Sequence, residues 1–443
     1  MTVARRACAL AAATAMVATI AGCGRTSTDS RQDGDSGDHV VSIAKCQDYQ
    51  PTAGITKDKI LLGSSFPSSG PLAVLAKLAQ GYRAYFKYVN AKDGGIGGRK
   101  IEVVSYDDAY DPSRTVSNVN RLINEDKVFA LVGVPSTPGN FAFWDRTEAS
   151  CVPNLMASTA AADYATTIKH RWTLNGLVPY HTEGQALAQA LHEHSGAKKV
   201  AVLYQAGDFG GSMLKGVEAE SSALGMTVVS KESFQATDPS VTTQITSLAA
   251  TGADALVVVA AGTPCAQALD AVSKTSWKPQ VAVSYTCTSR ALMKLASPAG
   301  SEGILSVTPF KDPSARRWSS DEGAKTYRES VKTYEPDADP EDSFVANGWF
   351  YGEVVYAILK NARSLTRQDV MDSALSLSGV TASMALPGVT LTTGSADATP
   401  VESVQLQRYD AATHEWQFMD GGSPLQDGQT KILTFDYAKS SAR

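Results

Sequence analysis

Lys59-Ile-Leu-Leu-Gly-Ser-Ser-Phe66 opens the stretch of sequence, residues 59–112, that decides the fold. This short apolar run between polar residues predicts a buried strand. In the loop Ser68-Ser69-Gly70-Pro71, Gly70 allows positive φ and Pro71 suits the first position of a helix. Beyond the loop, apolar residues recur every three or four positions, which predicts an amphipathic helix covering a sheet: Leu75, Leu78, Ala79, Tyr82, Tyr85, Phe86 and Val89.

A second strand follows this helix. The glycine-rich segment Gly94–Gly98 ends the helix, the apolar run Lys100–Tyr106 predicts the strand, and Asp111-Pro112 predicts the cap of the next helix. The result is a strand–helix–strand unit with a serine-rich loop at the carboxyl end of its first strand. Ligands of open α/β sheets usually bind at that end.

The order of these residues resembles the type I periplasmic binding proteins, specifically their leucine/isoleucine/valine-binding branch. The motifs that carry the resemblance are Ser69-Gly70-Pro71, Asn90–Gly98, Tyr106-Asp107-Asp108 and Asp111-Pro112. The similarity continues at lower density through the rest of the mature chain. It implies an α/β fold of two doubly wound, Rossmann-like lobes joined by a three-strand hinge around a ligand cleft.

Composition sets the broad class of protein. The chain has 443 residues, of which 43% are hydrophobic and 19% charged, which suits a globular protein with sizeable cores. At about 150 residues per domain, two to three domains are expected. The net charge of −5 argues against nucleic-acid binding, which usually shows a concentrated basic excess.

The N-terminus reads as a targeting signal. Arg5-Arg6 precede the apolar segment Ala7–Ile20, which is too short to predict a spanning helix. The following Ala21-Gly22-Cys23 resembles the bacterial lipobox, in which the cysteine is lipidated after cleavage; the alternative is an ordinary secretory signal cleaved near Ala21. We therefore expect a signal peptide at 1–22, lipidated Cys23 with a flexible tether at 23–54, and anchoring to the outer face of the bacterial cell membrane.

Four cysteines lie beyond the targeting segment, which suggests disulfides in an oxidising compartment. Cys46 and Cys151 each precede a predicted strand, so both belong at the amino-end edge of one sheet. Cys265 and Cys287 each follow a predicted strand, at a carboxyl-end edge. Of the three possible pairings we predict Cys46–Cys151 and Cys265–Cys287. No Cys-x-x-Cys motif or clustered histidine pair supports the alternative of a metal site.

The alternation of short strands and helices predicts a parallel, doubly wound sheet, and the pattern begins again at Lys199. By resemblance, the chain crosses between the lobes near 177–179, 307–309 and 387–389. The resemblance thus assigns 55–177 and 311–387 to the first lobe, and 178–310 and 388–443 to the second. Three short connections can bend at a few φ/ψ angles, as hinge closure requires.

No catalytic constellation is evident. Asp107-Asp108 are adjacent on a strand and point to opposite faces, so a turn role is favoured over acid/base catalysis. Gly94–Gly98 follows a helix, the reverse of a dinucleotide-binding loop. The remaining candidates lack a nucleophile elbow or metal spacing: Ser136, Ser158, His181, His192 and His194. We expect no enzyme activity, no metal and no cofactor.

Three loops at strand carboxyl ends converge on the predicted cleft: Ser69-Gly70, Ser136-Thr137 and Ser158-Thr159-Ala160. Each offers hydroxyls and backbone N–H groups at a helix start, where partial positive charge favours a ligand carboxylate. The resemblance implies that Thr137 or Ser136, with Ser158 to Ala160, hold that carboxylate. The alternative for each hydroxyl is a plain helix N-cap, and the two roles are compatible.

The second lobe departs from the leucine-binding pattern. Tyr285 stands where relatives place the glutamate that pairs with the ligand ammonium, Phe209 replaces a tyrosine, and Leu75 replaces another; Phe344 matches a family aromatic. A buried ammonium without its carboxylate costs several kcal/mol, roughly 3–5. Either Asp208 or another acid substitutes, or the ligand has no α-ammonium. We expect an amino acid or a related carboxylate- or amide-bearing small molecule with an apolar or aromatic body; simple branched-chain amino acids remain an alternative that these residues do not favour.

The resemblance implies a monomeric solute-binding lipoprotein that delivers its ligand to an ABC permease. A ligand-sensing surface lipoprotein that signals to a receptor is the alternative, because both would use the same cleft. A surface hydrolase is a third hypothesis, which turnover of an ester or amide panel by the purified protein would reveal.

Overall fold

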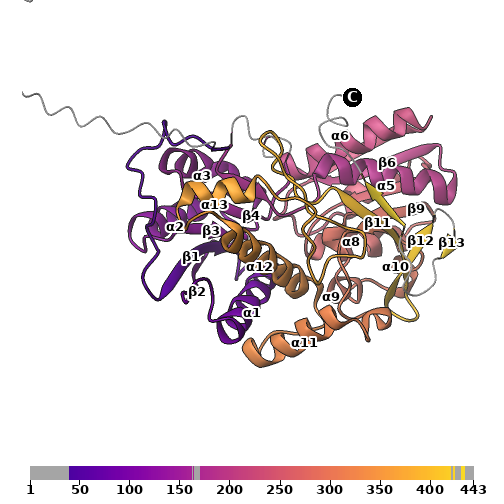
Figure 1. Cartoon of the computed structure of the whole chain (residues 1–443). Coiled ribbons are helices and arrows are strands. Elements are labelled where there is room, and N and C mark those ends of the chain that lie inside the picture. The colour runs from indigo at the N-terminus through magenta and orange to yellow at the C-terminus, as the bar shows by residue number, and fades with distance from the viewer. Residues whose placement is uncertain (1–38, 162, 164–169, 421–422, 425–430, 435–443) are drawn as a thin grey trace, which may run out of the picture. The chain divides into compact units, whose positions relative to one another are not determined.

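The predicted first strand, β1 (Lys59–Phe66), lies inside a parallel sheet (Figure 1). The computed structural model describes residues 39–161, 163, 170–420, 423–424 and 431–434, and they belong to one unit, His39–Arg443. The predicted signal peptide, Cys23 and the tether up to residue 38 lie outside the described residues.

The first sheet has the strand order β2-β1-β3-β4-β5, and each neighbouring pair is parallel. After β1 the chain adds β2 on one side and then β3 on the other, so the topological switch point lies between β1 and β3. The remaining strands are β2 (Lys100–Asp107), β3 (Ala130–Val132), β4 (Asn154–Ala157) and β5 (Thr173–Asn175).

Helices cover both faces of this sheet. One face carries α2 (Pro112–Asn124) and α3 (Thr137–Ser150), and the other carries α1 (Lys77–Lys92) with α12 (Ser343–Asn361). Glycines allow the backbones of α1 and α12 to approach each other closely. A Cβ atom at Gly81 would lie 2.0 Å from the carbonyl oxygen of Val345, and a Cβ atom at Gly348 would lie 1.9 Å from the carbonyl oxygen of Leu78. The neighbouring α11 (Glu322–Tyr334) and α13 (Arg367–Ala374) complete this side.

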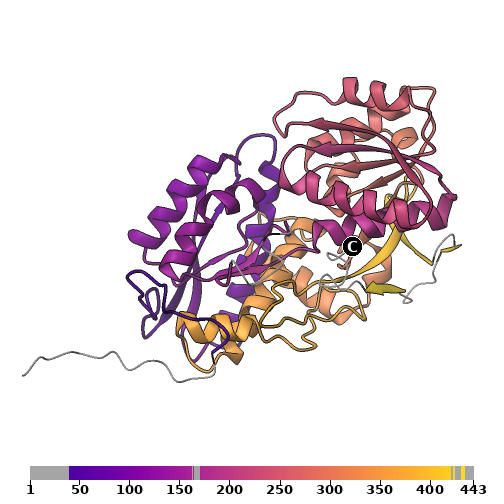
Figure 2. The ribbon, with the colours of Figure 1, turned by 90° about the horizontal axis from the view of Figure 1, so that it is seen from above.

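The second sheet repeats the arrangement. Among the described residues it has the order β13-β12-β11-β10-β9-β8-β6-β7, with β14 paired to β11. The parallel part, in which the switch point lies between β6 and β8, consists of β6 (Lys199–Gln205), β7 (Thr227–Phe234), β8 (Ala255–Val259), β9 (Gln280–Val283) and β10 (Leu305–Thr308). The later strands, yellow in Figure 2, add to it antiparallel: β11 (Ser403–Asp410), β12 (Glu415–Asp420), β13 (Ser423–Pro424) and β14 (Ile432–Thr434).

Side chains of β6 and β8 alternate between two cores. Val200 and Val202 belong to the core beneath α5 (Tyr180–Ser195) and α6 (Asp208–Ala223), whereas Ala201 and Leu203 belong to the core beneath α7 (Thr242–Ala249) and α8 (Thr263–Ser273). This alternation is what a sheet with helices on both faces requires. Two short helices, α9 (Arg290–Met293) and α10 (Pro298–Ser301), follow near α8.

The chain passes between the two sheets three times, close to the predicted crossings. It leaves the first sheet after β5, returns after β10 and leaves again after α13. The last two passages are hydrogen-bonded to each other, since Lys311 N–H donates to Met384 O (2.9 Å) and Leu386 N–H to Pro309 O (2.9 Å). The predicted fold class is confirmed; the lobe boundaries themselves stay a prediction.

Some elements begin with short turns. The helix expected from Pro71 starts as a 3₁₀ turn, η1 (Ala73–Ala76), before α1, and another short turn, η3 (Arg316–Trp318), precedes α11. Strand β9 ends at Val283, because Ser284 Oγ accepts the Thr286 N–H (3.4 Å) and turns the chain into η2 (Tyr285–Cys287).

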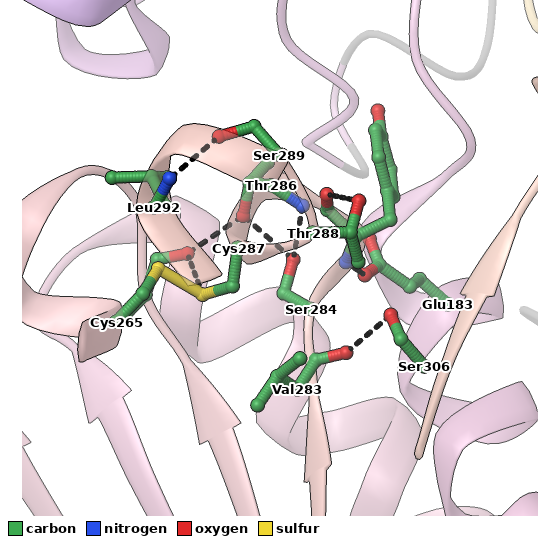
Figure 3. The surroundings of a disulfide bond; sticks show 12 residues. Glu183, Cys265, Val283, Ser284, Thr286, Cys287, Thr288, Ser289, Leu292 and Ser306 are labelled. Carbon is green, nitrogen blue, oxygen red and sulfur yellow. Dashed lines mark hydrogen bonds between the residues drawn. A yellow bond between two sulfur atoms is a disulfide. The ribbon is translucent and has the colours of Figure 1, made fainter. Parts of the chain in front are cut away.

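Both predicted disulfides are present. Cys46 pairs with Cys151 across a sequence separation of 105, and Cys265 pairs with Cys287 across 22. Cys151 ends α3 just before β4, at the amino-end edge of the first sheet. The Cys265–Cys287 bond joins the start of α8 to η2, at the carboxyl-end edge of the second sheet (Figure 3).

Candidate functional site

A hollow lies where the carboxyl-end loops of the two sheets meet. Loops beyond β1, β3 and β4 supply its wall on one side, and loops beyond β6, β8 and β9 supply it on the other, so both switch points border it. It encloses about 530 Å³, its open mouth included, and its lining residues are Leu75, Leu78, Tyr110, Pro135, Ser136, Thr137, Ser158, Leu177, Tyr180, Phe209, Ala261, Tyr285, Thr286, Phe344, Asn347 and Tyr351.

The hydroxyls on the side of the first sheet are ordered by one another. Ser136 caps α3 by accepting the Gly139 N–H (2.9 Å). The Thr137 hydroxyl lies 3.0 Å from Tyr180 Oη, and Tyr351 Oη donates to Ser158 Oγ at 3.2 Å. Each hydroxyl oxygen has two acceptor lone pairs, so this network can still bind a polar ligand group.

The opposite wall is a turn that side-chain hydrogen bonds hold in place. Glu183 Oε1 accepts the Tyr285 N–H (2.8 Å), and Thr286 Oγ1 donates to the Ala260 carbonyl (2.6 Å). Figure 3 shows Glu183 beside this turn, which itself carries Thr286 and Cys287 of the Cys265–Cys287 disulfide. These contacts fix Tyr285 and Thr286 at the edge of the hollow.

The hollow is aromatic, and its lining residues in the described part of the chain include no charged side chain. The rings of Tyr180 and Phe209 meet edge to face, with centroids 4.9 Å apart. Such a surface binds apolar or aromatic groups, and a few hydroxyls fix their orientation. It offers no carboxylate to an α-ammonium group.

Neither Asp208 nor Glu183 replaces that carboxylate. Asp208, the substitute considered from the sequence, is exposed at the start of α6 and does not line the hollow. Glu183 is buried behind Tyr285, and burial raises its pKa to about 7 despite the opposing hydrogen bond from the Tyr285 N–H. Glu183 therefore acts as a support for the turn.

Two lining atoms are buried without a hydrogen-bond partner among the residues that the structure describes: Tyr285 Oη and Asn347 Oδ1. An unpaired buried polar atom costs about 1–3 kcal/mol. Tyr285 is only 6% exposed, so its hydroxyl is not solvated by the surrounding water either. A ligand group that pairs these atoms would recover that energy.

Seven of the ten ligand-binding residues predicted from the sequence line the hollow, and three do not. Thr159 stands behind the wall, 3.0 Å from the Thr137 hydroxyl, and Ala160 accepts the Tyr180 N–H (3.2 Å). Ser69 is exposed and donates to Asp107 (2.7 Å). The seven lining residues are Leu75, Ser136, Thr137, Ser158, Phe209, Tyr285 and Phe344.

The Asp107-Asp108 pair has the turn role expected for it. Burial would raise the pKa of Asp107, but hydrogen bonds from Ser69 Oγ and from the Ser68 and Ala109 N–H groups lower it to about 2. Asp108 is fully buried and accepts the hydroxyl of Ser65 (2.7 Å). Both carboxylates therefore hold the loop beyond β1.

Two of the three lining residues of α12, Asn347 and Tyr351, were not predicted from the sequence. Phe344, Asn347 and Tyr351 are spaced by three and four residues, so they share one face of that helix. Tyr180, at the start of α5, was also missed. The helical spacing beside the predicted Phe344 was the signal that could have found Asn347 and Tyr351.

One group of side chains has metal-ligand character within the described chain: His39, Asp369 and Asp372. The Arg363 guanidinium occupies it, since its Nη2 lies 3.0 Å from Asp372 Oδ2 and its Nε lies 3.1 Å from Asp369 Oδ1. A cation there would face a fixed positive charge, so the cluster is an ion-pair network that ties residue 39 to α13.

Comparison with known proteins places the chain in a family. The family model described as "Periplasmic binding protein" matches residues 59–414. The chain therefore belongs to the periplasmic binding protein family, as predicted. Among the described residues, no helix combines the length and apolar character needed to cross a bilayer.

Curated relatives point to the predicted branch. The chain is 27% identical over 257 residues to "Leu/Ile/Val-binding protein homolog 7" of Brucella suis biovar 1 (strain 1330), covering 55% of this chain and 63% of the relative. It is 27% identical over 164 residues to an "Amino acid binding protein" of Pseudomonas aeruginosa, covering 36% of this chain and 43% of the relative. The matched region thus spans less than two thirds of these relatives.

Solved structures share the fold. A fatty acid ABC transporter substrate-binding protein from Thermomonospora curvata has a TM-score of 0.73 and 22% identity, covering 88% of this chain and 96% of the other. An extracellular ligand-binding receptor from Rhodopseudomonas palustris HaA2 has a TM-score of 0.71 and 21% identity, covering 82% of this chain and all of the other.

Proposed function

We propose that this chain is an extracytoplasmic solute-binding protein of an ABC importer, which captures a small molecule between its two α/β halves and changes no covalent bond. The observation that carries the proposal is the hollow at both switch points. Its walls come from both sheets, so a ligand there contacts both halves at once, and such contacts favour a closed arrangement over an open one.

The solute class follows from the lining of the hollow. Hydroxyls of Ser136, Thr137 and Ser158 suit a carboxylate or amide group, and the aromatic walls suit an apolar or aromatic body. The relatives' names refer to leucine, isoleucine and valine or to amino acids, but the lining here supplies no partner for an α-ammonium. We infer a solute that bears a carboxylate or amide and has no ammonium on the adjacent carbon.

Mass spectrometry of the small molecule that stays bound to the purified protein tests this directly. We expect an apolar or aromatic acid or amide, and calorimetry should then show its rebinding at micromolar concentration. Phe209→Ala should weaken that binding. Retention of a simple branched-chain amino acid would contradict the solute class, and the absence of binding across amino acids, amides and aromatic acids would contradict the function.

Delivery and anchoring form the remaining part of the proposal. A lipid on Cys23 would hold the protein on the outer face of the cell membrane beside an ABC permease, and the protein would act as a monomer. Residues 55–177 with 311–387, and 178–310 with 388–443, would be the two moving lobes. Release of the protein from the membrane fraction by Cys23→Ala would support the anchor. Signalling to a receptor instead of a permease would use the same hollow.

A further inference from the structure

A second hollow adjoins the first. It encloses about 470 Å³, its mouth included, and four residues line both hollows: Tyr285, Thr286, Phe344 and Asn347. These four side chains form a waist between the two spaces. The unpaired Tyr285 Oη and Asn347 Oδ1 both belong to this waist.

The second hollow differs from the first because charged side chains, Lys311 and Asp312, line it. Lys311 is already neutralised: its Nζ lies 2.9 Å from each carboxylate oxygen of Asp321 and donates to Ser383 O (2.8 Å). These contacts use the hydrogen-bonding capacity of the ammonium group. Lys311 therefore offers little to a ligand.

Asp312 has no such partner. Its Oδ1 accepts the N–H (2.9 Å) and the hydroxyl (2.7 Å) of Ser314, while its Oδ2 has neither a hydrogen-bond donor nor a salt-bridging cation within the described part of the chain. Burial raises the pKa of Asp312, although the Ser314 hydrogen bonds and the charge of Arg290, which forms no direct salt bridge with Asp312 among the described residues, oppose the rise. The second hollow thus contains an acid that a cationic ligand group could neutralise.

The rest of the wall also favours a hydrogen-bond donor. The hydroxyl protons of Thr286 and Thr288 are used on the carbonyls of Ala260 (2.6 Å) and Tyr285 (2.7 Å), so their oxygens present only lone pairs. Aromatic rings, including that of Trp416, complete the lining. Acceptor oxygens, aromatic rings and one carboxylate without a direct salt bridge in the described chain together suit an ammonium group.

We propose that the second hollow binds the protonated amine of an elongated solute, whose apolar body fills the first hollow and whose ammonium group pairs with Asp312. This inference rests on the proposed function and deepens it. The amine would lie beyond the Tyr285–Asn347 waist, a full body length from the hydroxyls that take the other end of the solute. A simple α-amino acid cannot reach both places, because its ammonium and carboxylate are on the same carbon.

Calorimetry with three matched probes tests the inference: 4-phenylbutylamine, 4-phenylbutan-1-ol and 4-phenylbutanoate share one body and differ in the terminal group. In the parent protein, we expect the amine to bind at least about tenfold more tightly than the alcohol. Asp312→Asn keeps the acceptor for Ser314 but removes the charge, and should abolish that preference. Asp208→Asn, which changes an exposed acid outside both hollows, is the matched control and should leave it intact.

The parent comparison needs no variant, so the test holds even if Asp312→Asn folds poorly. Equal affinity for the amine and the alcohol overturns the inference, as does an amine preference that persists in Asp312→Asn. Binding of aromatic acids or amides without binding of the amine overturns the inference but leaves the proposed function intact. If no probe and no small acid, amide or amino acid binds, both proposals fail.

Discussion

Replacing the Cys265–Cys287 disulfide by two serines should weaken ligand binding as well as the fold. The bond joins the start of α8 to η2, the turn that carries Tyr285 and Thr286 to the waist between the two hollows (Figure 3). Without it, the turn keeps its hydrogen bonds to Glu183 and Ala260 but loses its covalent anchor.

The expected magnitudes follow from the loop lengths. Closing a loop with a sequence separation of 22 reduces the entropy of the unfolded chain and stabilises the fold by about 3.4 kcal/mol in the chain-entropy model. If binding must also reorder about one residue of the released turn, affinity falls by a further 1–2 kcal/mol, roughly tenfold. We therefore expect a lower midpoint in guanidinium denaturation and about tenfold weaker binding of the retained solute.

Cys46→Ser/Cys151→Ser is the matched control. This disulfide spans 105 residues, so its loss should cost more stability, about 4.8 kcal/mol, yet it lies at the amino-end edge of the first sheet and away from the hollow. Its removal should leave affinity unchanged below the unfolding transition. The reasoning is refuted if the control pair weakens binding as much, or if the Cys265/Cys287 variant binds as tightly as the parent.

Three further changes test separate contacts. Tyr285→Phe removes a buried hydroxyl that has no partner in the described chain. It should raise the free energy of unfolding by up to about 1–3 kcal/mol and lower the affinity for the solute, whereas a less stable variant would show that the hydroxyl is paired. Gly81→Ala should destabilise the protein by about 1–3 kcal/mol or more, because its Cβ would lie 2.0 Å from the Val345 carbonyl oxygen. Gly211→Ala, with open space around its Cβ, is the control and should be neutral or stabilising. Equal denaturation midpoints for the two variants would contradict this packing. Burial raises the pKa of Glu183 from 4.5 to about 7, so its contribution to stability is intact below pH 4.5 and is lost as the pH rises through 7. In pH-dependent denaturation, Glu183→Gln should therefore gain stability relative to the parent over that range, by up to about 3 kcal/mol at pH 8; a constant difference between the two proteins from about pH 4 to pH 8 would contradict this.

The fold could be predicted because local signals agree with the tertiary structure. The strand at Lys59–Phe66, the aspartate cap at Asp111 and the pairing of the four cysteines each depend on chain-local patterns that the packing does not overrule. Element starts were less predictable. A proline such as Pro71 permits a helix to begin, but the chain first forms a 3₁₀ turn there.

The site was only partly predictable, because its walls come from segments far apart in the sequence. The polar loops beyond β3 and β4 were found from strand-end position alone. Helical spacing from Phe344 could have indicated Asn347, but the lack of a partner for the Tyr285 hydroxyl within the described chain depends on how α12 approaches η2, which no local pattern encodes. Ser69 was expected at the ligand, but the local geometry gives its hydroxyl to Asp107.

The most direct test of the central claim is calorimetry of the purified protein with leucine beside a panel of aromatic and aliphatic acids and amides. Because no charged side chain of the described residues lines the first hollow, we expect micromolar binding of at least one acid or amide, and no measurable binding of leucine. Micromolar leucine binding that is lost on Tyr285→Ala would contradict it, because an α-ammonium would then be held in the hollow without the carboxylate partner that such a group needs.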